Sequence, residues 1–121
     1  MFDAKTVILT VLEIINYQKD KNQFANEFVD LCCRKALVAA IATLPESRRK
    51  RLEKNINGQK DIDKAITEIL KFISKDLYQK KLILISEETL TKYINTIMPA
   101  ISPEQEKELR KYLNDLGNIK I

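Results

Sequence analysis

Glycine and proline are scarce in this chain, and their scarcity constrains the fold more than any other feature of the sequence. Only two glycines and three prolines occur in 121 residues. An all-β or loop-rich chain of this length uses many more, because these residues set the backbone angles of its turns. Apolar residues recur at the three- and four-residue spacing of amphipathic helices. The sequence therefore predicts an all-α protein, a compact antiparallel bundle of five to six helices.

Apolar periodicity and end signals predict six helices in a single domain that spans residues 1–121. A chain of this length matches one domain and can bury a sizeable core. Asp3 is the expected N-cap of the first helix, and Gly117 is expected to end the last. Thr43 with Glu46 has the spacing of a capping box, as has Ser102 with Gln105. The helices are predicted near residues 3–19, 22–43, 44–56, 61–80, 87–98 and 103–116.

The segment KKLILIS, residues 80–86, fits two structures. It either continues the preceding helix or forms an extended segment after that helix ends. Ser86 then serves as the N-cap of the helix near 87–98. Both alternatives keep an all-α fold.

The predicted core combines the apolar arcs of these helices. Leu12 and Ile69 lie at the centres of two such arcs. The apolar face of the second helix is predicted to include Leu31, and the stripe of the fourth is predicted to include Phe72. We therefore expect these four side chains to be buried.

The residue types in the chain argue against catalysis and cofactor binding. The chain contains no histidine, and its two glycines cannot form a glycine-rich phosphate loop. Cys32 and Cys33 are adjacent, which disfavours a bridge on a helix, so we expect reduced, structural thiols. Paired carboxylates lie at predicted helix N-termini, where the helix dipole favours them. We predict a non-enzymatic protein with no cofactor, no metal and no small-molecule ligand.

No segment of the sequence is expected to enter a membrane. The longest strongly apolar run is residues 36–44, and a helix needs about 20 apolar residues to cross a bilayer. The first residues lack the pattern of a signal peptide. A cytoplasmic location is predicted.

Positive charge is concentrated in the first half of the chain. The formal net charge is +4, and residues 1–60 hold 11 cations and 7 anions, whereas residues 61–121 hold 10 of each. A basic balance attracts polyanions. The chain also holds 16 isoleucines, 16 lysines and 8 asparagines, a mixture that AT-rich codons produce in any protein.

The run of four cations from Arg48 to Arg51 allows two interpretations. It is either a solvated helix surface with local ion pairs or a contact patch for an anionic partner. Glu46 and Glu53 lie three or four residues from Arg49 and Lys50, the spacing at which side chains on one helix can form ion pairs. Arg48 falls within the apolar arc of its helix, so it must snorkel or find a partner.

A larger candidate surface arises if the predicted third and fourth helices pack side by side. Its cations would merge, and Tyr78 could stack on a base. The candidate contacts for an anionic partner are Arg49, Lys50, Arg51, Lys54, Lys64, Lys71, Lys75 and Tyr78.

Two functions follow from these features. The leading prediction is a small helical protein-interaction module whose partner is a protein, either another copy of the chain or a different one. The alternative is a helical nucleic-acid-binding or ribonucleoprotein-associated protein that uses the basic surface.

Overall fold

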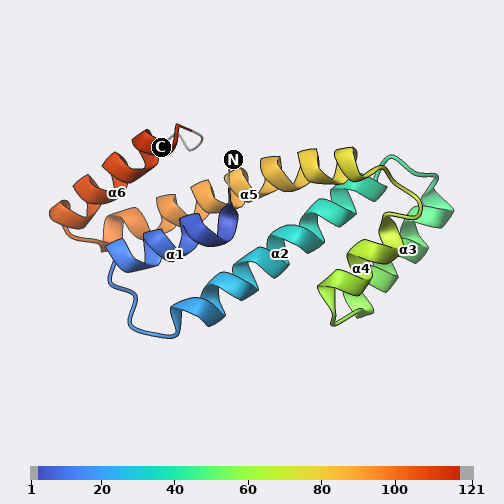
Figure 1. The fold of residues 1–121 in the computed structure, drawn as a ribbon, viewed down its shortest axis with the longest axis horizontal. Coiled ribbons are helices and arrows are strands. Elements are labelled where there is room, and N and C mark those ends of the chain that lie inside the picture. The colour runs from blue at the N-terminus through green and yellow to red at the C-terminus, as the bar shows by residue number, and fades with distance from the viewer. Residues whose placement is uncertain (1–2, 118–121) are drawn as a thin grey trace. The chain divides into compact units, whose positions relative to one another are not determined.

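The computed structural model describes residues 3–117 and is all-α, which confirms the predicted fold class (Figure 1). The described residues form six α-helices and one short 3-10 helix, η1. Their bounds are α1 (Ala4–Ile14), α2 (Lys21–Ile41), α3 (Glu46–Gly58), α4 (Ile62–Ile69), α5 (Lys75–Ile97), η1 (Met98–Ala100) and α6 (Pro103–Leu116).

The chain divides into two compact units. The first unit holds the residues up to Val29 and those from Ser86 onward, so it contains α1, the start of α2, the end of α5, η1 and α6. The second unit is Asp30–Ile85 and contains the rest of α2, α3, α4 and the start of α5.

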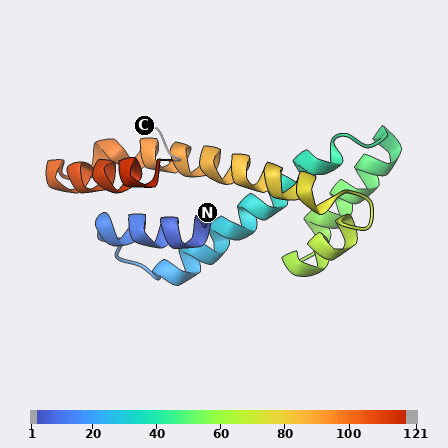
Figure 2. The ribbon, with the colours of Figure 1, turned by 45° about the horizontal axis from the view of Figure 1, so that its top comes forward.

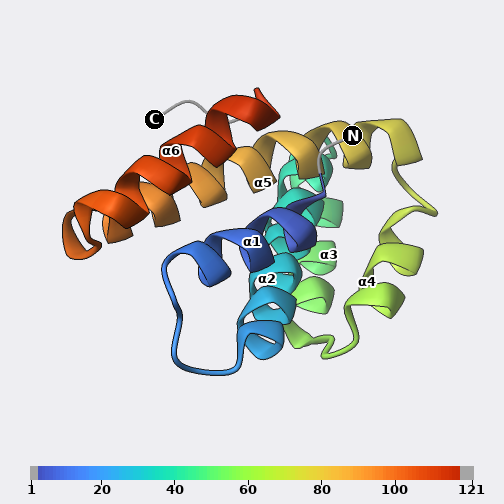
Figure 3. The same ribbon diagram turned by 60° about the vertical axis from the view of Figure 1, so that its left-hand side comes forward.

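In the first unit, the end of α5 and α6 form a hairpin joined by η1, and α1 packs against α6 (Figures 2 and 3). Three aromatic rings add to this packing, because Phe24 lies between Tyr17 and Tyr93 with centroid distances of 5.3 and 5.2 Å. The buried apolar residues of this unit are Val7, Ile8, Val11, Leu12, Ala25, Phe28, Leu90, Ile94, Leu109 and Leu113.

In the second unit, α3 packs against α4, and the end of α2 contributes to the same core. Figure 1 shows α3 and α4 side by side. The core consists of Ala36, Leu37, Ala40, Ile41, Leu52, Ile56, Ala65, Ile69, Ile73 and Tyr78.

Three helix ends follow the predicted signals. The Asp3 carboxylate accepts hydrogen bonds from the backbone N–H groups of Lys5 and Thr6 and so caps α1. Ser102 and Gln105 form a capping box at the start of α6. Gly117 ends α6 in the left-handed conformation, with φ of 74°.

Two other predicted ends are wrong. The first helix ends at Ile14, not near residue 19, because Asn16 adopts a left-handed backbone with φ of 56°, which asparagine tolerates. Thr43 does not cap α3, since its hydroxyl donates instead to the carbonyl of Ala40. The third helix accordingly runs over Glu46–Gly58 and not over residues 44–56.

The predicted helix over 61–80 is two helices, α4 and α5, separated by the turn at residues 70–74. Ser74 begins the second of them, because its hydroxyl accepts a hydrogen bond from the N–H of Leu77 at 3.2 Å. Residues 80–86 are helical and lie inside α5. Ser86 is buried within that helix and is not an N-cap, so the helix predicted near 87–98 begins earlier, at Lys75.

Two of the four residues predicted to be buried are in the core. Leu12 and Ile69 are almost completely buried. Leu31 and Phe72 are 45% and 43% exposed, so their assignment to the core is wrong. Phe72 lies in the turn after α4, where the helical phase no longer applies.

Candidate functional site

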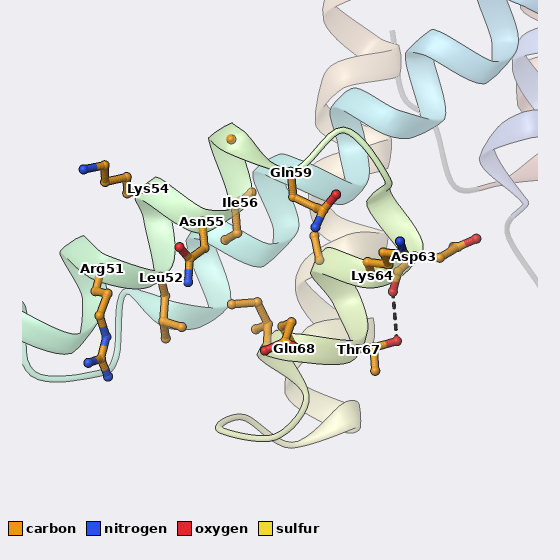
Figure 4. A pocket seen from close by; sticks show the side chains of 13 residues that line it. Arg51, Leu52, Lys54, Asn55, Ile56, Gln59, Asp63, Lys64, Thr67 and Glu68 are labelled. Atoms are coloured by element: carbon orange, nitrogen blue, oxygen red, sulfur yellow. Dashed lines mark hydrogen bonds between the residues drawn. The ribbon is translucent and has the colours of Figure 1, made fainter.

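An open groove with a volume of about 940 Å³ lies between α3 and α4 in the second unit (Figure 4). We call it the α3–α4 groove. Its floor is apolar and consists of the buried residues Leu52, Ile56, Ala65 and Ile69. Its rim is polar and consists of Arg51, Lys54, Asn55, Gln59, Asp63, Lys64, Thr67 and Glu68.

The groove follows from the amphipathic pattern of the two helices. Leu52 and Ile56 are four residues apart on α3, and Ala65 and Ile69 are four apart on α4, so each pair lies on one helix face. These faces meet and form the floor. The polar residues beside them are left at the rim, where they face solvent.

Three of the predicted cations are paired with carboxylates three or four residues away in the sequence. Lys50 Nζ lies 3.1 Å from Glu46 Oε1, and Arg49 Nε lies 4.0 Å from Glu53 Oε1. These pairs bear out the local pairing that the sequence spacing predicted. Lys71 pairs in the same way with Glu68, at 3.4 Å.

The other four predicted cations form no ion pair within the part of the chain that the structure describes. Three of them, Arg51, Lys54 and Lys64, line the α3–α4 groove. The fourth, Lys75, begins α5 and does not line it. Three of the four predicted cations that lack a carboxylate partner thus line the same groove.

The rim residues point in different directions (Figure 4). Arg51 and Lys64 stand at opposite ends of the groove, with Asn55 and Gln59 between them. Lys54 extends to the far side of α3, so it contributes little charge to the groove. The cations therefore do not merge into one continuous basic surface.

Arg48 was expected either to extend to solvent or to find a partner, and it contacts the aromatic ring of Phe72. It is exposed, and its guanidinium lies over the ring of Phe72, 5.5 Å from the centroid. A cation–π contact at an exposed site contributes about 0.5–1 kcal/mol. Arg48 therefore covers an exposed aromatic ring at the surface and is not part of the core.

Tyr78 does not belong to the candidate surface. Its side chain is only 6% exposed and forms part of the core of the second unit. The prediction placed it on the same face as Lys64 and Lys71 by counting helical phase through residues 70–74. The turn at those residues resets the phase, and Tyr78 consequently faces inward.

The Tyr78 hydroxyl is buried without a hydrogen bond of acceptable geometry within the described residues. Burial raises its pKa well above the ordinary tyrosine range, and the neighbouring Cys33 thiol raises it further. Burial also raises the pKa of Cys33, against a smaller opposing effect from Tyr78. Cys32 and Cys33 are both buried and are not bridged.

Replacing Tyr78 with phenylalanine should leave the free energy of unfolding unchanged or raise it by up to about 1 kcal/mol. An unsatisfied buried hydroxyl costs about 1–3 kcal/mol, and phenylalanine keeps the ring that fills the core. Denaturant titration near neutral pH would measure the change. A loss of more than about 1 kcal/mol would mean that the hydroxyl is satisfied in solution.

The raised pKa values of Tyr78 and Cys33 predict that the free energy of unfolding falls at alkaline pH. Unfolded tyrosine loses its proton near pH 10, whereas folded Tyr78 keeps it, so the unfolded chain is favoured as the pH rises above about 10. Cys33 acts in the same direction from slightly lower pH. The Tyr78→Phe variant should therefore lose less stability between neutral pH and about pH 11 than the unaltered protein.

Arg34 supports the groove, a role that no sequence pattern predicts. Its Nη1 atom donates to the carbonyls of Ile56 and Gln59, both at 2.7 Å, and Nη2 donates to the carbonyl of Lys60 at 3.2 Å. Its Nε atom pairs with Asp30 at 2.8 Å. Arg34 thus ties α2 to the end of α3 and to the loop that leads into α4.

Asn55 and Gln59 are also residues that sequence reasoning missed. Asn55 makes no side-chain hydrogen bond within the described residues, and the side-chain oxygen Oε1 of Gln59 accepts one from the backbone N–H of Asp61 at 3.2 Å. Both amides offer a donor and an acceptor to a bound molecule. Only the packing of α3 on α4 reveals them, since neither belongs to a sequence motif.

The described helices include none that is long and apolar enough to cross a membrane. Within the described residues, no three cysteine or carboxylate side chains are grouped so that they could hold a metal ion. Comparisons of the chain with protein-family models, curated proteins and solved structures gave no match.

Proposed function

We propose that this protein is a non-enzymatic interaction module that binds a partner protein through the α3–α4 groove. The observation that carries this proposal is the combination of an apolar floor with rim groups that lack partners. Arg51 and Asn55 make no side-chain ion pair or hydrogen bond within the described residues. Arginine is enriched at protein interfaces, where an apolar centre is surrounded by a polar rim.

The titratable groups at the groove favour binding over catalysis. Glu68 is exposed and paired with Lys71, and Asp63 lies in the first turn of α4, where the helix dipole favours a carboxylate. The absence of histidine from the whole chain removes the commonest general base.

Nucleic-acid binding is the second candidate, and the unpaired Arg51, Lys54 and Lys64 favour it. Other features of the site favour a protein partner. No aromatic residue lines the groove, and Tyr78, the expected stacking residue, is in the core.

Affinity capture from the source cell, with and without nuclease, tests the proposal. We expect a protein partner that survives nuclease treatment and is lost with Asn55→Trp, which fills the groove without changing charge. The matched control is Lys35→Glu with Lys80→Glu, two exposed positions outside the groove that should leave capture unchanged. Loss of all partners after nuclease treatment would favour the nucleic-acid function instead.

Two further features belong to the same proposal. The partner is either another copy of this chain or a different protein, and size-exclusion chromatography over a range of concentrations separates these cases. We also propose a cytoplasmic location, as expected from the sequence.

A further inference from the structure

We infer that the segment bound in the α3–α4 groove is a short, extended acidic peptide with an apolar residue between two carboxylates. This inference rests on the proposed function and adds the chemistry of the partner.

Charge at the two ends of the groove favours carboxylates. Arg51 stands at one end and Lys64 at the other, and neither has an ion-pair partner within the described residues (Figure 4). A guanidinium binds a carboxylate through two parallel hydrogen bonds, which fixes the direction of the bound group as well as its charge. Each end of the groove therefore suits an acidic side chain.

The two carboxylates of the rim do not cancel this preference. Glu68 is already paired with Lys71, at 3.4 Å. Asp63 extends away from α3 in Figure 4, and it lies in the first turn of α4, next to the positive end of the helix dipole. Arg51 and Lys64 are left as the unneutralised charges that a ligand in the groove would meet.

The middle of the groove suits a peptide main chain and one apolar side chain. The Asn55 amide has a free donor and a free acceptor, which match the C=O and N–H of an extended backbone. The accessible surface of the groove as a whole is more apolar than polar, so an apolar side chain of the ligand can lie against it.

The length of the groove sets the spacing of the two acidic residues. Arg51 and Gln59 are eight residues apart, which corresponds to about 12 Å along a helix. An extended peptide advances about 3.3 Å per residue, so about four residues cover this length. Gln59 lies between Arg51 and Lys64 in Figure 4, so the carboxylates that meet these two cations are at least this far apart. The expected ligand therefore has two acidic residues at least about three positions apart, with an apolar residue between them.

Selection from a phage-displayed library of random peptides about ten residues long tests the inference. Selected peptides are resynthesised, and their affinities are measured by fluorescence anisotropy against the full chain and its variants. We expect the acidic–apolar–acidic pattern among them. Reversing both Arg51 and Lys64 to glutamate should weaken binding by more than about tenfold.

Matched variants keep the result interpretable. Lys35→Glu with Lys80→Glu makes the same change in net charge at exposed, unpaired positions outside the groove, and it should bind as the unaltered protein does. Asn55→Trp should abolish binding by filling the groove. Circular dichroism and thermal unfolding would show that each variant is folded, as expected for exposed positions.

The outcomes separate the two proposals. Peptides that lose binding with Asn55→Trp but carry no acidic pattern would overturn the acidic ligand and leave the groove as a protein-binding site. Peptides that bind Asn55→Trp unchanged, or the absence of any selected peptide, would overturn both. Single-stranded RNA that binds the unaltered protein at about 50 mM salt, and not the Arg51 and Lys64 double variant, would assign the groove to nucleic acid instead.

Discussion

Replacing Ile69 with alanine should lower the free energy of unfolding by about 2–5 kcal/mol, and replacing Leu12 with alanine should do the same. Ile69 is 1% exposed in the core of the second unit, and Leu12 is completely buried in the first. Each change removes buried methyl and methylene groups and leaves a cavity that close-packed neighbours fill only in part. Denaturant titration followed by circular dichroism would measure both losses.

The chain supplies matched controls for these two changes. Ile83 and Leu84 are the same residue types on α5, and they are 42% and 61% exposed. Their replacement by alanine should cost less than about 1 kcal/mol, because much of each side chain already contacts water. Equal losses at buried and exposed positions would show that the two cores do not have the described packing.

Helix ends could be predicted from the sequence where they depend only on contacts between near neighbours. Asp3, Ser102 and Gly117 act through hydrogen bonds and backbone angles that involve only their near neighbours, so local sequence was sufficient. The turn between α4 and α5 was missed because the apolar stripe continues through it to Ile73. Ser74 supplies the competing signal, a serine that caps the next helix.

The candidate site was predictable only where it depends on one helix. The pairing of Lys50 with Glu46 follows from a spacing of four residues and was foreseen. The position of Tyr78 depended on helical phase across an unforeseen turn, and its assignment to the surface was therefore wrong. Asn55 and Gln59 became candidates only when the packing of α3 on α4 placed them along one groove.

Replacing Arg34 with alanine should lower the free energy of unfolding by about 2–4 kcal/mol. The side chain of Arg34 is 22% exposed and donates hydrogen bonds to three carbonyls. One hydrogen bond to a charged group contributes about 1.5–3 kcal/mol net, and the three contributions do not add, because water can reach some of the carbonyls when the side chain is removed. The carbonyl of Ile56 lies in the last turn of α3, where the helix supplies no N–H donor for it. Lys35→Ala is the control, because Lys35 is the exposed and unpaired neighbour on α2, and it should stay within about 0.5 kcal/mol.

Arg34→Lys tests whether the loss comes from charge or from geometry. A lysine ammonium keeps the positive charge and can pair with Asp30, but it is a compact point charge and cannot span carbonyls on both the end of α3 and the following loop. We therefore expect Arg34→Lys to lose at least half as much stability as Arg34→Ala, with faster amide exchange in α4, whose N-cap Asp61 follows the clamped carbonyl of Lys60. Full stability in Arg34→Lys would show that charge alone is sufficient. If Arg34→Ala lost no more stability than Lys35→Ala, water would be replacing the hydrogen bonds that Arg34 donates to the three carbonyls. The loop after α3 would then need no side chain to hold it against α2.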